Sequence, residues 1–343
     1  SPRKIPPVER ERILALIRTQ YPDFGPTLAA EQLNERHGVH RDPTTVRDLM
    51  VAAGLWLPRA QRPSTSVVHR AWRERKAHRG ELVQFDGSYH DWFEGRDGAG
   101  AACLLAAIDD ATGELLLAQF APHEGTLPVM GFWGHYAARH GLPQAVYLDR
   151  FSTYKMTQRA ARENHDCKTQ LQRAFATLGI EPIFALSPEA KGRVERLFKT
   201  LQDRLVKELR LRNLATAEAA NRFLADRFLP AFNTKFRVVP RAAADYHRTL
   251  SERERRELPD TLCRMEQRSV MNDFTVSFKN QWYQILPTRG LAIRPKDAVL
   301  VREYPDGLIS FSIRNKRAAA SPIPKRQPLR MSANVLVRTL VPA

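Results

Sequence analysis

The chain has 343 residues, which is too long for one ordinary domain and fits two or three. Its 54 Lys and Arg outnumber its 37 Asp and Glu, giving a formal net charge of +17, while 43% hydrophobic residues are enough to form buried cores. Three widely separated cysteines exclude a disulfide scaffold or a CxxC zinc site, and no apolar run is long enough for a membrane span.

The strong positive charge favours a polyanionic partner, of which nucleic acid is the commonest. An anionic membrane surface is the rival, but no basic amphipathic helix with bulky aromatic residues is found. Because no signal peptide is recognisable, we expect a cytoplasmic, nucleoid-associated protein with no membrane partner. The chain begins with Ser1 rather than Met, so we expect a further segment upstream.

Residues 1–58 predict three short helices separated by tight Gly and Pro turns. Proline suits the first turn of a helix, and Asp42 before Pro43 is a typical N-cap. The expected helices cover Val8–Thr19, Pro26–Gly38 and Pro43–Gly54. This pattern indicates an N-terminal all-α helix-turn-helix DNA-binding domain, with a plain three-helix bundle as the alternative. The side chains that its last helix would present to a major groove are Thr44, Thr45 and Arg47.

Residues 59–80 contain seven Lys or Arg and a single Glu, which is more basic than a simple linker. We interpret this segment as a basic arm that follows DNA; a solvated charged helix is the alternative. The candidate DNA contacts in it are Arg70, Arg73, Arg75 and Lys76.

Residues 81–232 have the pattern of a mixed α/β domain. Three strands come first and are followed by helix, strand, helix, strand and helix, which predicts a mixed sheet with helices on its faces. The expected strands are 82–89, 101–108, 115–120, 145–148 and 182–185, and the expected helices are 126–140, 158–178 and 191–211.

The remainder of the chain divides into three segments. Residues 233–261 are interpreted as a charged connector with some helix. Residues 262–315 carry short strands with turns between them, at 275–278, 282–285, 298–302 and 309–313, which predicts a small antiparallel β-barrel. Residues 316–343 are interpreted as a basic tail, since there are seven Lys or Arg and no acid from Arg314 to Ala343.

Three carboxylates lie in or next to predicted strands and helices at positions where a functional group is expected. Asp86 interrupts an apolar strand, Asp149 follows the strand 145–148, and Glu195 lies in the first turns of the helix 191–211. The separations are 63 and 46 residues. Carboxylates that converge on one site repel one another unless cations intervene, and two Mg²⁺ ions would serve a phosphoryl displacement. The alternative is that they are ordinary capping and solvated acids.

The motifs around these acids resemble the catalytic core of bacterial insertion-sequence transposases of the retroviral-integrase superfamily, and most closely the ISNCY-like group. Lys191–Arg196 is the most specific motif, because it places a glutamate on its helix among basic neighbours. The other matching runs are Gln84–Glu94, Ile108–Gly113, Tyr147–Arg150, Tyr21–Ala29 and Ala52–Trp56. The resemblance covers about residues 10–315.

The resemblance implies an RNase H-like core in which Asp86, Asp149 and Glu195 are the catalytic and metal-binding DDE residues. It implies two Mg²⁺ ions, with Mn²⁺ as a substitute, and no small-molecule cofactor. The 46 residues before Glu195 exceed the spacing of retroviral integrases, and we expect the insertion in the region 159–168. Family members usually carry another helix-turn-helix upstream.

The predicted function is therefore that of a DDE transposase that nicks 3′-ends and transfers strands. The expected partners are double-stranded DNA, as transposon ends and as target, and further copies of the chain, in a dimer or higher oligomer. The alternatives are a metal-dependent nuclease of the same fold and a DNA-binding repressor or architectural protein. Asp109 and Asp110 are expected to shape a turn. Further candidate DNA contacts near the acids are Lys155, Lys191, Arg193 and Lys199.

Overall fold

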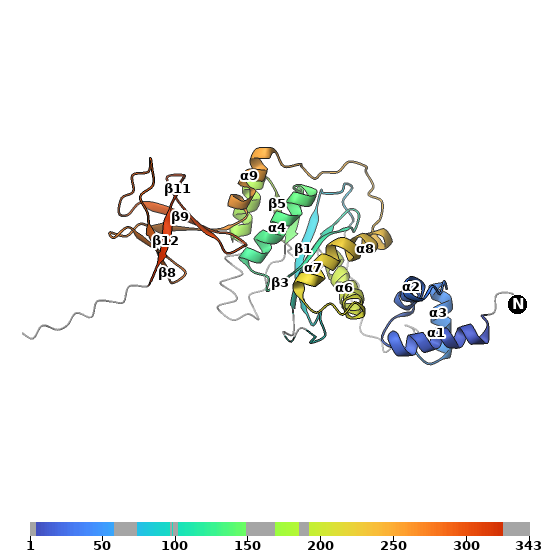
Figure 1. Ribbon diagram of the computed structural model, residues 1–343. Helices are drawn as coiled ribbons and strands as arrows, with labels where there is room; N and C mark the ends of the chain where they lie inside the picture. The colour runs from blue at the N-terminus through green and yellow to red at the C-terminus, as the bar shows by residue number, and fades with distance from the viewer. Residues whose placement is uncertain are drawn as a thin grey trace, which may run out of the picture. The chain divides into compact units, whose positions relative to one another are not determined.

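The computed structural model describes residues 5–57, 74–96, 98, 102–148, 169–184 and 192–324. The chain divides into two compact units, whose helices and strands are labelled in Figure 1. The first unit comprises Ser1–His123, Pro143–Arg150 and Pro182–His247, and the second comprises Glu124–Leu142, Phe151–Glu181 and Arg248–Ala343.

Three short helices open the first unit, which confirms the three helices predicted there. They are α1 (Pro7–Gln20), α2 (Pro26–His37) and α3 (Pro43–Ala52). Each begins with a proline, because the N–H that proline lacks has no intrahelical partner in the first turn. The Asp42 carboxylate caps α3 by accepting a hydrogen bond from the Thr44 N–H at 2.7 Å. One shared core contains Ile13, Ile17, Tyr21, Leu28, Leu33, Val46 and Met50.

A five-stranded mixed sheet follows in the first unit, with the strand order β3-β2-β1-β4-β5. β1 pairs antiparallel with β2 and parallel with β4, and β2 pairs antiparallel with β3. β2 is a continuous apolar run because both of its faces are buried. The strands are β1 (Val83–His90), β2 (Ala102–Asp109), β3 (Leu115–Ala121), β4 (Ala145–Leu148) and β5 (Glu181–Phe184).

Helices after the sheet pack against β1 and β3. The long helix α6 (Gly192–Leu211) buries the stripe predicted from its periodicity, and each large apolar side chain in such a stripe contributes about 1.5–3 kcal/mol. The stripe consists of Val194, Leu197, Phe198, Leu201, Leu205 and Leu209. α7 (Ala217–Phe223), the π-helical turn η4 (Leu224–Phe228) and α8 (Leu229–Phe236) extend the same core.

The turn η4 lies directly before Pro230 and lets the helix continue past it. A proline inside an α-helix removes one hydrogen bond and crowds the carbonyl four residues earlier. In η4 the Leu229 N–H bonds instead to the Leu224 carbonyl, five residues back, which widens the backbone at this point. Since α8 continues to Phe236, the predicted boundary between residues 232 and 233 falls within this helix.

The chain then returns in an extended conformation along the first unit. The N–H groups of Val238, Ala242 and Tyr246 donate hydrogen bonds to the carbonyls of Thr112, Ala77 and Arg79. Arg79 also forms an ion pair with Asp245 at 2.6 Å. The backbone of the charged segment predicted as a connector is therefore attached to the residues before β1 and to the turn between β2 and β3.

The second unit begins with helices. They are α4 (Thr126–His140), residues 169–178 and α9 (Glu252–Thr261). An edge-on contact between Trp133 and Phe175, with ring centroids 4.9 Å apart, joins the first two. Arg173 joins the second to the following segment by donating to the Cys263 carbonyl at 2.6 Å. The predicted helix 158–178 is described only from residue 169.

Two antiparallel sheets complete the second unit and share one apolar core. The four-stranded sheet has the order β11-β10-β9-β6, and the three-stranded sheet has the order β12-β8-β7. The four predicted strands are present, and β6, β11 and β12 are additional. The bounds are β6 (Arg264–Ser269), β7 (Thr275–Phe278), β8 (Gln281–Ile285), β9 (Ala298–Glu303), β10 (Ile309–Ile313), β11 (Lys316–Ala318) and β12 (Ala320–Ile323).

The sheets extend beyond residue 315, where the sequence predicts a basic tail. Lys316 and Arg317 belong to β11, which pairs with β10. Their side chains are exposed, while that of Ala318 is buried. Because β11 is an edge strand with two exposed basic residues, its sequence looks like that of a basic tail. Closure of the two sheets into a barrel stays a prediction.

Candidate active site

Asp86 lies within β1, on the strand face that also carries Gln84 and Ser88. Side chains two residues apart on a strand point to the same face. The backbone of Asp86 is paired with that of Ala106 in β2, and the residue is half-buried. A rigid strand thus fixes this carboxylate in a position where partial burial makes its charge costly without a donor or a cation nearby.

α6 lies along this face of β1 and is held at two points. The Val194 N–H donates to Gln84 Oε1 at 3.3 Å, and Gln202 Nε2 donates to Ser88 Oγ at 3.2 Å. Glu195 follows Val194 and lies two helical turns before Gln202 on the same side of the helix. The half-buried Asp86 and Glu195 therefore lie on facing surfaces of two packed elements.

Asp149, the third predicted carboxylate, lies outside the described residues. β4 ends one residue earlier and runs parallel to β1, where Val83 pairs with Val146 and Gln84 with Tyr147, an offset of 63 residues. Within the described part of the chain, no three His, Cys, Asp or Glu side chains gather closely enough to hold a metal ion.

Asp109 is fully buried at the end of β2 and shapes the turn into β3. Its carboxylate accepts hydrogen bonds from the Gly80 N–H at 2.8 Å, the Thr112 N–H at 2.8 Å and the Thr112 hydroxyl at 2.7 Å. Burial raises the pKa of Asp109 above its ordinary value, because desolvation disfavours the charged form more than these donors favour it. The turn role predicted for Asp109 fits these contacts.

Asp110 is also fully buried, but its side chain reaches beyond the turn. Its Oδ1 accepts hydrogen bonds from Gln84 Nε2 at 2.7 Å and from Arg193 Nη1 at 2.8 Å, and its Oδ2 accepts one from the Lys76 N–H at 2.9 Å. Asp110 thus joins β1 to α6. In the sequence, the signal for this role is limited to two consecutive acids after a buried strand.

Arg193 was predicted as a DNA contact, and this stays a prediction; in the structure it has a structural partner. Its side chain is 11% exposed and forms an ion pair with the buried Asp110. The attraction between the two charges offsets part of the cost of burying them, and Arg193 is the cation that α6 presents to Asp110.

The other predicted DNA contacts fall into three groups. Thr44 and Arg47 are exposed on α3, Thr45 is half-buried there, and Lys199 is exposed on α6. Arg75 and Lys76 are held against the first unit, since Arg75 donates to the Ala111 carbonyl at 3.3 Å and Lys76 pairs with Glu81 at 3.1 Å. Lying outside the described residues are Arg70, Arg73, Lys155 and Lys191.

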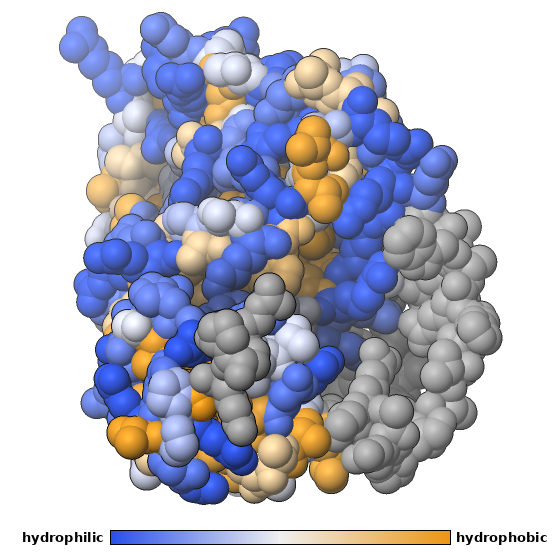
Figure 2. Space-filling view, turned by 90° about the vertical axis from the view of Figure 1, so that its right-hand side faces the viewer, coloured by the Kyte–Doolittle hydropathy of each residue, from blue (hydrophilic) through white to orange (hydrophobic). Residues whose placement is uncertain are grey.

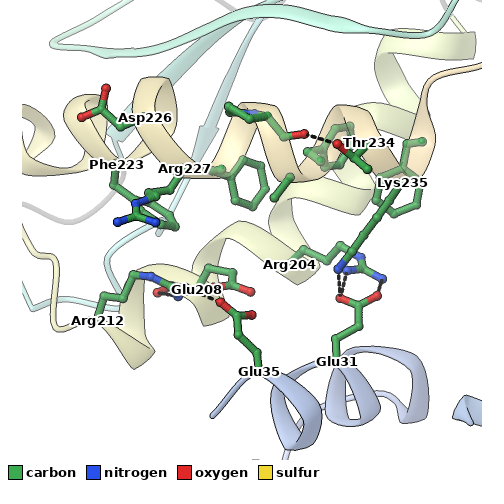
Figure 3. A pocket seen from close by; sticks show the side chains of 15 residues that line it. Glu31, Glu35, Arg204, Glu208, Arg212, Phe223, Asp226, Arg227, Thr234 and Lys235 are labelled. Atoms are coloured by element: carbon green, nitrogen blue, oxygen red, sulfur yellow. Dashed lines mark hydrogen bonds and ion pairs between the residues drawn. The ribbon is translucent and has the colours of Figure 1, made fainter. Parts of the chain in front are cut away.

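A separate cavity of about 620 Å³ lies between α2, α6 and α8 (Figure 3), and neither Asp86 nor Glu195 lines it. Its charged side chains neutralise one another. Glu31 accepts hydrogen bonds from Arg204 at 2.7 and 3.1 Å and pairs with Lys235 at 2.7 Å. Burial raises the pKa of Glu208 in the same cavity. We interpret this cavity as an ionic contact between the N-terminal helices and α6 rather than as the active site.

The surface is largely hydrophilic on the face shown in Figure 2. Among the helices that the structure describes, none combines the length and apolar character that crossing a bilayer requires.

Comparison with known proteins gives two relatives by sequence. "Putative transposase y4bF" of Sinorhizobium fredii is 41% identical over 302 residues, which cover 87% of this chain and 63% of that protein. "Transposase for insertion sequence IS1202" of Streptococcus pneumoniae is 29% identical over an alignment 349 residues long, and the match covers 91% of this chain and 72% of that protein. The chain thus spans less than two thirds of the first relative. No protein-family model matches it.

Both relatives are named as transposases, the second for an insertion sequence, and the chain is similar to them over most of its own length. The predicted resemblance to insertion-sequence transposases is thereby confirmed, while the retroviral-integrase superfamily and the ISNCY-like group stay predictions. Among solved structures, the chain is similar to a chain of the simian T-cell lymphotropic virus intasome in complex with PP2A regulatory subunit B56 gamma. The match covers 90% of this chain and 99% of that chain. The identity is 15% and the TM-score 0.37.

Proposed function

We propose that the chain is a DDE transposase, which nicks the ends of its element and joins the exposed 3′-hydroxyls to target DNA. The observation that carries the proposal is the position of Asp86 and Glu195 on facing surfaces of β1 and α6. The names of the two sequence relatives support the reaction class.

An RNase H-like core is part of the proposal. The strand order β3-β2-β1-β4-β5, with three antiparallel strands followed by a parallel β4, supports it. The offset of 63 residues between paired positions of β1 and β4 equals the separation of Asp86 and Asp149 in the sequence. This equality supports a common site for Asp86 and Asp149, and the contacts between α6 and β1 support adding Glu195 to it.

The donor set fits hard divalent cations, because carboxylate oxygens are the ligands that Mg²⁺ prefers. Asp86, Asp149 and Glu195 would hold two Mg²⁺ ions, or Mn²⁺ in their place. When bound, such ions lower the barrier to phosphoryl transfer by stabilising charge on the attacking and leaving oxygens. The contribution of the chain is position: a strand carries Asp86 and a packed helix carries Glu195, so both carboxylates are held before DNA arrives.

DNA binding is assigned to the exposed surface of α3, where Thr44 and Arg47 are available to a groove and its phosphates. The net charge of +17 supports a DNA partner. Because two element ends must be joined together, we propose that at least two copies of the chain act on DNA.

A strand-transfer assay with pre-cleaved element ends and Mg²⁺ tests the proposal. We expect joined products from the wild type and none from Asp86→Ala, Asp149→Ala or Glu195→Ala. Asp203→Ala is the matched control, since Asp203 lies on α6 with its side chain 60% exposed and pairs with Lys207.

The other outcomes separate the alternatives. Nicked but unjoined DNA would indicate a nuclease, and bound but unaltered DNA would indicate a repressor or architectural protein. Wild-type strand transfer by any one of the three alanine variants would contradict the assigned site.

A further inference from the structure

We propose that Asp110 is a positioning residue: by binding Arg193 and Gln84 it holds the first turn of α6, and with it Glu195, against β1 beside Asp86. The inference rests on the proposed function, in which Asp86 and Glu195 act together.

The first step of the reasoning is the burial of the contacts. Asp110 has no exposed surface, and the side chain of Arg193 is 11% exposed. One oxygen of Asp110 accepts from both Arg193, at 2.8 Å, and Gln84, at 2.7 Å. The second oxygen accepts from the Lys76 N–H at 2.9 Å, which fixes the orientation of the carboxylate.

The second step is that the hydrogen bonds of Asp110 extend through Gln84 to the backbone of α6. Gln84 uses its amide nitrogen toward Asp110 and its carbonyl oxygen toward the Val194 N–H, at 3.3 Å. N–H groups in the first turn of a helix have no partner within the helix. A side chain from β1, oriented by Asp110, therefore supplies a partner for the beginning of α6.

The third step connects this network to the two carboxylates. Gln84 precedes Asp86 by two residues and shares its strand face, and Arg193 precedes Glu195 by two residues in the first turn of α6. Any loosening of the network shifts the helix start relative to the strand, which changes the separation of Asp86 and Glu195. Gln202 holds α6 only two turns further along.

The test compares Asp110→Asn with Asp109→Asn. The two aspartates are adjacent and fully buried, but the hydrogen-bond donors to Asp109 are Gly80 and Thr112, and neither lies in α6. The first readout is hydrogen exchange of peptides covering residues 192–199, measured without metal or DNA. The second is the Mg²⁺ concentration for half-maximal strand transfer, with binding of the element end measured in parallel.

In Asp110→Asn we expect exchange at residues 192–199 to become about tenfold faster, and the Mg²⁺ requirement to rise roughly 10–100-fold, the usual effect of losing a residue that orients metal ligands. End binding should stay unchanged, and Asp109→Asn should leave exchange at 192–199 at the wild-type rate. Arg193→Gln should behave like Asp110→Asn, and the double variant should be no worse than either single one.

Wild-type exchange at 192–199 in Asp110→Asn would overturn the inference, as would an equal increase in Asp109→Asn. If Asp110→Asn does not fold, Arg193→Gln and the charge-retaining Arg193→Lys decide: faster exchange in the first, partly restored by the second, supports the inference, and wild-type exchange in the first overturns it. If the wild type joins no DNA, the proposed function fails, while the exchange measurement still decides whether Asp110 anchors α6.

Discussion

Gly80 precedes β1 and adopts a backbone conformation that L-amino acids rarely adopt, with φ of 76°. A Cβ atom placed on it would lie 2.5 Å from Nδ1 of His247 and 2.6 Å from the His247 backbone nitrogen. Its N–H donates to Asp109 at 2.8 Å, and its carbonyl accepts from the Gln144 N–H at 2.9 Å. The substitution Gly80→Ala must therefore displace either His247 or this hydrogen-bonded backbone.

Two costs add in Gly80→Ala. The left-handed conformation costs an alanine about 1–2 kcal/mol. Overpacking against a backbone atom, which cannot move as the tip of a flexible side chain can, costs about 1–3 kcal/mol. We expect a loss of about 2–5 kcal/mol in the free energy of unfolding of the first unit, taking these costs together.

Urea denaturation, followed by circular dichroism and tryptophan fluorescence, measures this loss. Gly95→Ala is the matched control, because Gly95 lies in the same unit, has φ of 68° and would place its Cβ in open space. We expect the control to lose about 1–2 kcal/mol from the backbone cost alone. Equal losses in the two variants would refute the claim that close packing against His247 requires glycine at position 80.

Two further predictions concern pH and DNA. The pKa of Glu254 is lowered to about 2, first by the Ser251 N–H and then by the Ser251 hydroxyl and Arg248. Since this folded pKa lies below the unfolded value of 4.5, its stabilisation is complete above pH 4.5 and is lost as the pH falls toward 2. The melting-temperature difference between wild type and Glu254→Gln should therefore narrow over that range, and a pH-independent difference would contradict this. Arg47→Ala should weaken binding to element ends and reduce the slope of log affinity against log salt concentration by about 1, unlike the exposed Arg222→Ala on α7. An unchanged slope would contradict the proposal that α3 contacts DNA.

The elements with strong local signals were predictable from the sequence. α6 has a long apolar stripe at helical spacing, and α3 has an N-cap aspartate followed by a proline, so both were placed within a few residues. β2 was recognised from a continuous apolar run. These patterns report burial and capping, which depend on residues close in the chain.

The helices α7 and α8 were missed because Pro230 contradicts a helical reading of the segment. The π-helical turn before it preserves the helix, and the buried residues Phe223, Phe228 and Phe232 offset the irregular backbone by packing into the core. Similarly, β11 appears as part of a basic tail because an edge strand exposes Lys316 and Arg317. Tertiary packing decided these elements, and no local pattern encodes it.

For the candidate site, residue identity and spacing in the sequence predict Asp86, Asp149 and Glu195, and the motifs around them indicate a transposase. A carboxylate in an apolar strand or at the start of a helix can be recognised from the sequence, because the residues that define its position are its neighbours in the chain. The partner of Arg193 was not visible, since Asp110 lies 83 residues away in the sequence. The tertiary structure decided that Arg193 pairs with a buried carboxylate, because this ion pair forms only when α6 packs on β1 and brings Arg193 to Asp110.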